Sequence, residues 1–159
     1  MDIKDKSFEK IKKEAEDWYD SIDEAECPYF NDVVAFNAKG LKHVKFKKDR
    51  VARTRSDQFI RLKNLKFSQR ILEKSKTLQE YKEERCFEEK KSGNRRENVL
   101  QDVKYYGFVS IIKDDHGMRR LKIIVKQVAG GKLYFWSIIP FWKSNRDIKR
   151  MYSGNLEED

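Results

Sequence analysis

The sequence is poor in the residues that build metal centres and disulfide frameworks. It contains two cysteines, Cys27 and Cys86, which lie far apart without CxxC spacing, and two histidines, His43 and His116. This is a poor set for a zinc site, so we expect a reduced thiol pair and no cofactor. The two prolines and seven glycines argue against a disordered or fibrous chain.

Long apolar runs and several well-known catalytic motifs are also missing. No run approaches the roughly 18 apolar residues that a membrane span needs, and the opening stretch MDIKDKSFEK has no apolar core for a secretory signal. There is no glycine-rich phosphate loop, nucleophile elbow, HExxH or paired-carboxylate motif, which argues against a nucleotide-triphosphate enzyme, a serine hydrolase or a zinc protease. We therefore expect a cytoplasmic protein with no membrane partner.

Positive charge, in contrast, is abundant and unevenly spread. The formal net charge is +9, but residues 1–26 hold ten acidic and five basic residues, so the remaining residues carry +14. Residues 38–76 alone contain fourteen Lys and Arg against three acids. A local excess of this size attracts polyanions by counterion release. It favours a nucleic acid or a comparable anion as partner over a merely solvated charged face.

The first half of the chain has the apolar spacing of helices. Residues 3–25 carry apolar side chains at intervals of three and four, and Cys27-Pro28 should end this helix. A helix capped by Ser56, a joint at 64–67, and a second helix over 67–85 are expected next. Residues 88–98 read as a polar linker. Between these parts lie a β-type run, DVVAFN at 32–37, a turn, and one helical turn at 41–44.

The last third is rich in β-branched and aromatic residues. Three strands, at 103–112, 119–128 and 133–139, are separated by turns at 114–117 and 129–132 and must therefore be antiparallel. With the run DVVAFN this predicts an α+β fold, helices first and an antiparallel sheet after them. We divide the chain into an acidic helix (1–28), an α+β domain (29–143) and a tail (144–159) that adds a short helix and then frays.

Alternation along the predicted strands places basic side chains on one face. Arg120, Lys122 and Lys126 share an open face of their strand, while the opposite face packs on helices. On the next strand, Ser137 falls on a largely apolar face with Leu133 and Phe135. Ser137 could contact a phosphate or a neighbouring carbonyl, and spacing alone favours the structural role.

His43 lies in the stretch FNAKGLKHVKF, flanked by Lys42 and Lys45. Metal-free RNA cleavage needs a base, an acid and fixed cations, and histidine and arginine suit these roles. Nearby cations should also depress the pKa of His43 and favour its neutral form. On composition alone, however, a surface or structural role for His43 is favoured over catalysis.

Two stretches, VVAFNAKGLKHVKFK and KIIVKQ…GGKLYFWSIIP, together resemble small nuclease domains of phages and mobile elements. They resemble the superfamily that joins barnase, EndoU, the tRNA-cleaving colicins and RelE. The resemblance covers roughly residues 29–143 and implies N-terminal helices packed on a four-stranded antiparallel β-sheet. It further implies a metal-independent endoribonuclease acting on tRNA, mRNA or rRNA, often a toxin with an antitoxin or immunity protein as partner.

The resemblance also implies roles for individual residues. His43 matches the motif histidine, Arg53 or Arg55 the basic motif position, and Ser137 a polar residue on the last strand. A second proton carrier of the EndoU kind is missing, so Lys45, Lys126 or Tyr106 would have to serve. The further candidate RNA-binding residues are Lys42, Lys45, Arg61, Arg120, Lys122, Lys126 and Trp136. A non-catalytic RNA- or DNA-binding module is the alternative function, and a scaffold whose charge only aids solubility is a third.

Overall fold

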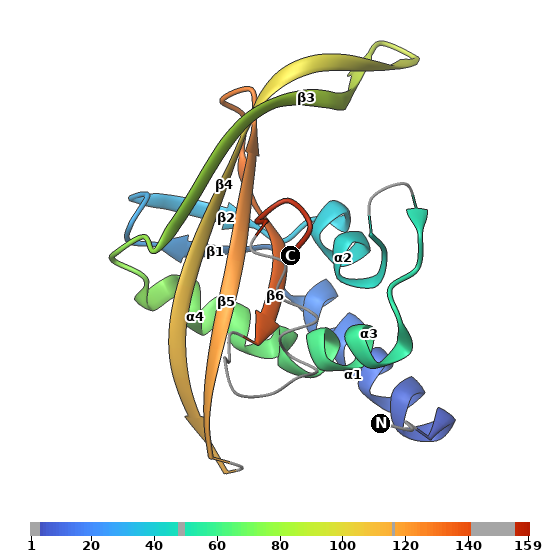
Figure 1. Cartoon of the computed structure of the whole chain (residues 1–159), viewed down its shortest axis with the longest axis vertical. Coiled ribbons are helices and arrows are strands. Elements are labelled where there is room, and N and C mark those ends of the chain that lie inside the picture. Colours follow the sequence, from blue (N-terminus) through green and yellow to red (C-terminus); the bar gives the residue numbers. More distant parts are fainter. Residues whose placement is uncertain (1–3, 48–49, 116, 141–154) are drawn as a thin grey trace.

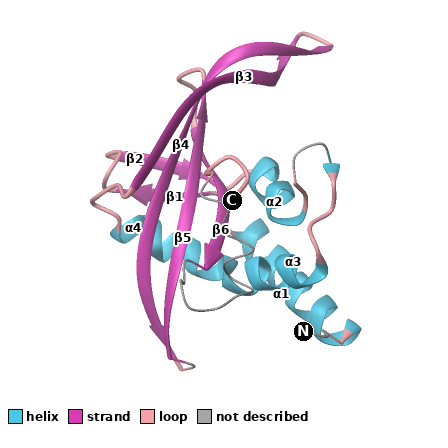
Figure 2. Ribbon diagram, viewed as in Figure 1, coloured by secondary structure: helices cyan, strands magenta, loops and turns pink. Residues whose placement is uncertain are grey.

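The protein has an α+β fold in which one mixed sheet carries helices on one face (Figures 1 and 2). The computed structural model describes residues 4–47, 50–115, 117–140 and 155–159. The helical elements are α1 (Asp5–Ser21), α2 (Ala38–Lys45), α3 (Arg55–Asn64), the 3-10 helix η2 (Leu65–Phe67) and α4 (Ser68–Lys74). The strands are β1 (Glu24–Cys27), β2 (Asp32–Ala35), β3 (Glu80–Ser92), β4 (Arg95–Asp114), β5 (Gly117–Val128) and β6 (Leu133–Pro140).

The sheet has six strands in the order β1-β2-β6-β5-β4-β3. The strands β4, β5 and β6 follow one another as antiparallel neighbours, as the sequence predicts. The strand β2, however, lies parallel to β6, with Ala35 opposite Tyr134. The expectation of four antiparallel strands is therefore wrong in strand number and in this pairing. Only a tight turn forces two strands to be antiparallel, and β2 reaches β6 through helices and three other strands.

The predicted second helix over 67–85 and the polar linker over 88–98 are both wrong. The helix α4 ends at Lys74, and the following residues form β3, which pairs with β4 from Glu80 opposite Gly107 to Ser92 opposite Arg95. This ladder satisfies the backbone donors and acceptors of β3 that face β4, in a segment whose side chains are mostly charged. The two strands form a long curved ribbon that extends beyond the rest of the sheet (Figure 1).

The N-terminal helix and the caps also differ from the sequence expectations. The helix α1 ends at Ser21, and Glu24–Cys27 pairs as a strand with β2. The cap of α3 is Thr54, whose hydroxyl accepts from the Asp57 amide, and not Ser56. The single helical turn expected at 41–44 belongs to the longer helix α2, capped by Asn37. Of the tail, residues 144–154 lie outside the described residues, and 155–159 pack against the sheet.

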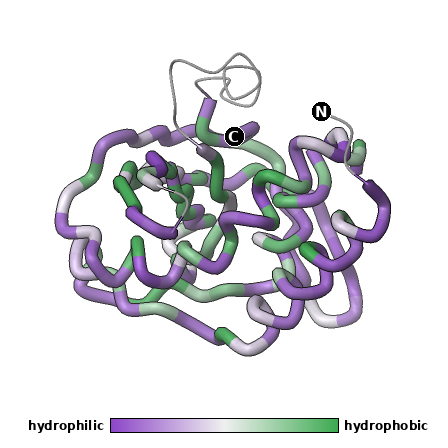
Figure 3. The backbone as a smooth tube through the Cα atoms, turned by 90° about the horizontal axis from the view of Figure 1, so that it is seen from below, coloured by the Kyte–Doolittle hydropathy of each residue, from purple (hydrophilic) through white to green (hydrophobic). Residues whose placement is uncertain are grey.

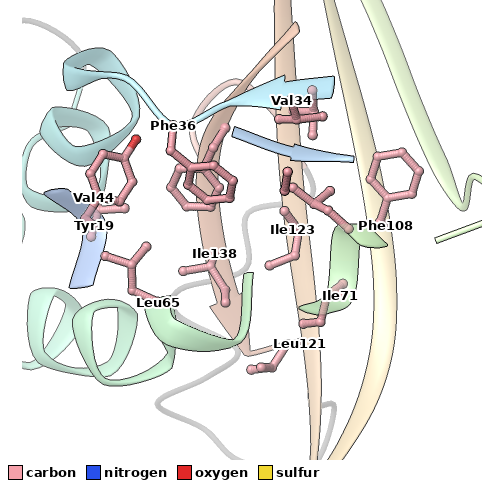
Figure 4. Packing of buried hydrophobic residues seen from close by; sticks show 14 of the residues in the cluster. Tyr19, Val34, Phe36, Val44, Leu65, Ile71, Phe108, Leu121, Ile123 and Ile138 are labelled. Carbon is pink, nitrogen blue, oxygen red and sulfur yellow. The ribbon is translucent and has the colours of Figure 1, made fainter. Parts of the chain in front are cut away.

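The main core lies between the helices and one face of the sheet. Tyr19 and Leu65 from the helical layer meet Phe36, Ile123 and Ile138 from the sheet side (Figure 4). Figure 3 shows that hydrophobic stretches are interspersed with hydrophilic ones along the whole chain. Among the described residues, no helix is long and apolar enough to cross a membrane.

Candidate functional site

The helix α2 lies directly against β6 because residue 40 has no side chain. A Cβ atom at Gly40 would lie 2.3 Å from the carbonyl oxygen of Phe135 and 2.8 Å from the hydroxyl of Tyr19. This close approach brings His43, one turn later, onto the indole of Trp136. The two rings stack with centroids 3.9 Å apart and planes 18° apart, and His43 is only 6% exposed. The histidine is thus a buried ring and not a surface residue.

A β-bulge at Trp136 decides where the neighbouring serine points. In the ladder between β5 and β6, Ile124 lies opposite Ser137 and Val125 lies opposite Phe135, so Trp136 has no partner of its own. The extra residue shifts the alternation. Phe135 packs in the main core with the helices, whereas Ser137 contacts Arg61 and Asp159. The expectation that Ser137 shares an apolar face with Phe135 is therefore wrong.

Two arginines and one aspartate form a buried array beside this bulge. Arg53 Nη1 lies 3.4 Å from Asp57 Oδ2, and Arg61 Nε lies 2.5 Å from Asp57 Oδ1. The four-residue spacing places all three side chains on one face of α3 and its preceding turn. Arg61 is fully buried and its Nη1 donates to Ser137 Oγ at 2.5 Å. One carboxylate thus faces two guanidinium groups, which leaves positive charge for other acceptors.

Arg53 also fixes the protonation state of His43. Its Nε donates to the His43 carbonyl at 2.9 Å, and its Nη2 lies 3.0 Å from His43 Nε2. Because a guanidinium only donates, Nε2 must be the acceptor and the imidazole carries its proton on Nδ1. Burial, and then the charges of Arg53, Arg61 and Lys126, lower the pKa of His43 to about 2. The imidazole is therefore neutral at physiological pH, in the direction expected from the sequence.

The guanidinium groups are perturbed in the same direction. Burial, followed by the charge of Arg61, lowers the pKa of Arg53 to about 10, although Asp57 and Asp159 oppose this shift. Burial also lowers the pKa of Arg61, again against Asp57 and Asp159. Arg53 remains a cation near neutral pH, because its lowered pKa still lies well above 7. Arg61 is paired through its Nε with the Asp57 carboxylate.

Two lysines of β5, Lys122 and Lys126, extend this group of basic side chains into a larger cluster. They lie on the second face of the sheet, opposite the face that packs in the main core. Lys126 Nζ lies 4.0 Å from the centroid of the Trp136 indole and 2.7 Å from Glu88 Oε1. Lys122 Nζ lies 3.1 Å from Glu80 Oε2 and 3.3 Å from Asp159 Oδ2. Both lysines are buried, so the expectation of an open basic face is wrong for them. The curved ribbon brings the β3 carboxylates over this face.

The acidic segment Asn155–Asp159 fills the centre of the cluster with oxygen acceptors. Arg53 Nη2 donates to the Glu158 carbonyl at 3.0 Å, and Trp136 Nε1 donates to the Glu157 carbonyl at 3.1 Å. Arg61 Nη1 and Ser137 Oγ both donate to the backbone oxygen of Asp159, the latter at 2.6 Å. Figure 1 shows this end of the described chain between β6 and α2.

The other sequence-predicted residues lie away from the cluster. Arg55 Nη1 pairs with Asp5 Oδ1 at 2.6 Å, and its guanidinium lies over the Phe8 ring. Lys45 pairs with Glu16 of α1. Lys42 and Arg120 are exposed. The structure therefore gathers His43, Arg53, Arg61, Lys122, Lys126, Trp136 and Ser137 in one place, and leaves Arg55, Lys42, Lys45 and Arg120 outside it.

Sequence reasoning missed Asp57 and the acidic segment. The spacing of Arg53, Asp57 and Arg61 was a readable signal, because residues four apart on a helix are neighbours. The signal for the segment was weaker, namely one apolar residue, Leu156, among acids in an otherwise basic chain. In the part of the chain that the structure describes, no three His, Cys, Asp or Glu side chains are grouped as a metal site.

No protein-family model, no curated protein and no solved structure matches the chain.

Proposed function

We propose that the cluster around His43 binds RNA phosphodiesters and that the protein is a metal-independent endoribonuclease. The observation that carries this proposal is the convergence of two buried guanidinium groups, Arg53 and Arg61, on a neutral imidazole and the Ser137 hydroxyl. Guanidinium forks match phosphate oxygens, and fixed cations in a buried site stabilise the charge that gathers on them during cleavage. The cluster already binds carbonyl oxygens, which shows its preference for acceptors.

In the proposed reaction, Arg53 and Arg61 hold the two non-bridging oxygens of one phosphate. When Arg53 turns to the phosphate it releases His43 Nε2, which takes the proton of the ribose 2′-hydroxyl. The 2′-oxygen bonds to phosphorus as the bond to the 5′-oxygen breaks, leaving a 2′,3′-cyclic phosphate. The negative phosphate also raises the affinity of His43 for that proton, against the two arginines.

The 5′-oxygen needs a proton donor, and Lys126 is the best placed of the three candidates named above. Its ammonium lies over the Trp136 indole, on which the His43 ring also stacks. Lys45 lies away from the cluster, paired with Glu16 of α1, and Tyr106 packs against Phe30 in the main core. We assign the acid role to Lys126, with Ser137 and Arg61 as charge-stabilising donors.

The alternative function, a non-catalytic RNA- or DNA-binding module, is favoured by a different observation. His43 Nε2 is already engaged by Arg53, and a pKa of about 2 makes the imidazole a weak base in this arrangement. In that case the cluster would grip a backbone without cleaving it. The two functions differ in whether His43 affects product formation.

The test is incubation of the purified protein with RNA in EDTA, using the adjacent arginines as a matched pair. Arg53→Gln and Arg55→Gln remove the same charge, but only Arg53 belongs to the cluster. We expect products ending in 2′,3′-cyclic phosphate, near-normal cleavage by Arg55→Gln, and a loss of about 10²-fold or more for His43→Gln and Arg53→Gln.

Two controls accompany this test. Circular dichroism identifies a variant that has lost its fold, and Arg53→Lys then replaces Arg53→Gln as the milder change. A substrate with 2′-deoxyribose at the cleavage site must resist, because it lacks the nucleophile. Binding without cleavage that is insensitive to His43→Gln would select the non-catalytic module. The target RNA and an antitoxin or immunity protein remain predictions from the sequence resemblance.

A further inference from the structure

The acidic segment Asn155–Asp159 lies where the proposed substrate would have to bind. Its backbone carbonyls accept from Arg53, Arg61, Ser137 and Trp136, the groups assigned above to RNA. A phosphate could not reach these donors while the segment is in place. Arg61 and Ser137 are fully buried in this state, so the site is closed to solvent.

The contacts of the segment go beyond its carbonyl oxygens. The Leu156 side chain is 4% exposed and packs against Val103, Tyr105 and Ile124 on the second face of the sheet. At the other end, Asp159 Oδ2 lies 3.3 Å from Lys122 Nζ. An apolar anchor and an acidic anchor, three residues apart, thus fix both ends of the segment.

The segment is also internally organised and further tied to β3. The amides of Glu158 and Asp159 donate to the Asn155 carbonyl at 3.1 and 2.9 Å, which closes a compact turn. Lys82 of β3 donates to Asn155 Oδ1 at 2.8 Å and lies 3.8 Å from Glu157 Oε2. A turn that is already formed binds at a lower entropic cost than an unstructured peptide.

We infer that Asn155–Asp159 is a built-in acidic ligand of the basic cluster, which holds it closed against external polyanions. The segment places carbonyl and carboxylate oxygens on the donors that would otherwise receive phosphate oxygens. The inference rests on the proposed function, because it identifies the occupant that RNA must displace. A tethered ligand competes at high effective concentration, so RNA binds only in the minor open state.

Two adjacent acids of the segment provide a matched pair for the test. Asp159 is buried against Lys122, whereas the Glu158 side chain is exposed. Asp159→Asn and Glu158→Gln therefore remove the same charge from the same segment but only the first weakens the closed state. Leu156→Ser releases the apolar anchor without any change of charge. Circular dichroism confirms that each variant is folded.

The first measurement is the affinity of each protein for a single-stranded RNA with 2′-O-methyl riboses, which cannot be cleaved by 2′-attack. We expect Asp159→Asn and Leu156→Ser to bind about tenfold or more tightly than the unchanged chain, and Glu158→Gln to match the unchanged chain. Equal affinity for all four proteins would overturn the inference. So would an equal gain for Asp159→Asn and Glu158→Gln, which would indicate general charge repulsion.

The second measurement separates this inference from the proposed function. The free peptide Asn-Leu-Glu-Glu-Asp is titrated into Leu156→Ser, and the change in tryptophan fluorescence is followed, because the Trp136 indole donates to Glu157. If no variant binds RNA, the proposed function fails, while saturable binding of this peptide still upholds the segment as the ligand of the cluster. Absence of peptide binding refutes that assignment whatever the result with RNA.

Discussion

The neutral state of His43 predicts a specific loss of stability in mild acid. In the folded protein the pKa of His43 is lowered from 6.5 to about 2, by burial and by the charges of Arg53, Arg61 and Lys126. In the unfolded chain it returns to the ordinary value near 6.5. Below that pH the unfolded state binds a proton that the folded state rejects, so stability falls as the pH falls.

The magnitude follows from the two pKa values. At about pH 5 the protonated form of an unfolded histidine exceeds its neutral form roughly thirtyfold. This protonation of the unfolded chain lowers the stability of the fold by about 2 kcal/mol relative to about pH 7.5. The size of this loss is set almost wholly by the unfolded value, because any folded pKa below about 4 gives nearly the same result. The prediction therefore depends on the burial of His43 and its contact with Arg53.

The assay is denaturant unfolding of the unchanged chain and of His43→Gln at both pH values. Glutamine keeps an acceptor for Arg53 but does not titrate, so carboxylate effects shared by the two proteins cancel in the difference. We expect the unchanged chain to lose about 2 kcal/mol more than the variant between the two conditions. Parallel losses, or an imidazole NMR signal of His43 that titrates near pH 6.5 in the folded protein, would refute the reasoning.

Two further predictions concern the helix α2. Gly40→Ala should destabilise the protein by about 2 kcal/mol, because the new Cβ would meet the Phe135 carbonyl oxygen. Alanine favours helices, so without this close packing the variant would be stabilised, and a raised midpoint of thermal unfolding would contradict the prediction. Asn37→Ala should lower the stability by about 1 kcal/mol, because it removes the side-chain oxygen that accepts from Lys39 N and Gly40 N. Asn37→Asp keeps such an oxygen and should lower the stability little. Denaturant unfolding compares the two variants, and equal losses would show that the cap contributes nothing.

The parts of the fold that could be predicted are those in which local pattern and tertiary structure agree. The strands from residue 103 onward are rich in β-branched and aromatic residues, end at turns and pair with the next strand, so composition and turn chemistry were sufficient. The run DVVAFN was also identified as a strand, but its parallel partner could not be. A parallel pairing between distant segments produces no sequence pattern that could be recognised in either segment alone.

The failure at β3 has a physical cause. Its inward side chains, such as Glu80 and Glu88, are charged because they face Lys122 and Lys126 across the sheet. A strand that buries carboxylates against lysines has no apolar alternation, so the apolar residues present suggested a helix instead. The tertiary partners decided the structure, and they lie 42 and 38 residues away in sequence.

For the site, the identity of several residues could be predicted from the sequence, but their arrangement could not. His43, Arg53 and Ser137 were singled out through the resemblance, and the charge around them through composition. The direction of Ser137 was not predictable, because the bulge at Trp136 depends on how β6 lies between β5 and α2. The burial of the segment around Leu156 could likewise not be predicted, since acidic side chains are mostly exposed to solvent.

The parallel pairing of Ala35 with Tyr134 has a consequence for folding during synthesis. The strand β2 and the helix α2 emerge from the ribosome early, but their support, β6, is among the last of the described strands to emerge. Contacts between such distant segments close slowly. His43 therefore cannot dock on Trp136 before β6 has emerged, and the cluster assembles only once β6 is available. The proposed nuclease would remain inactive on its own ribosome until that point of synthesis.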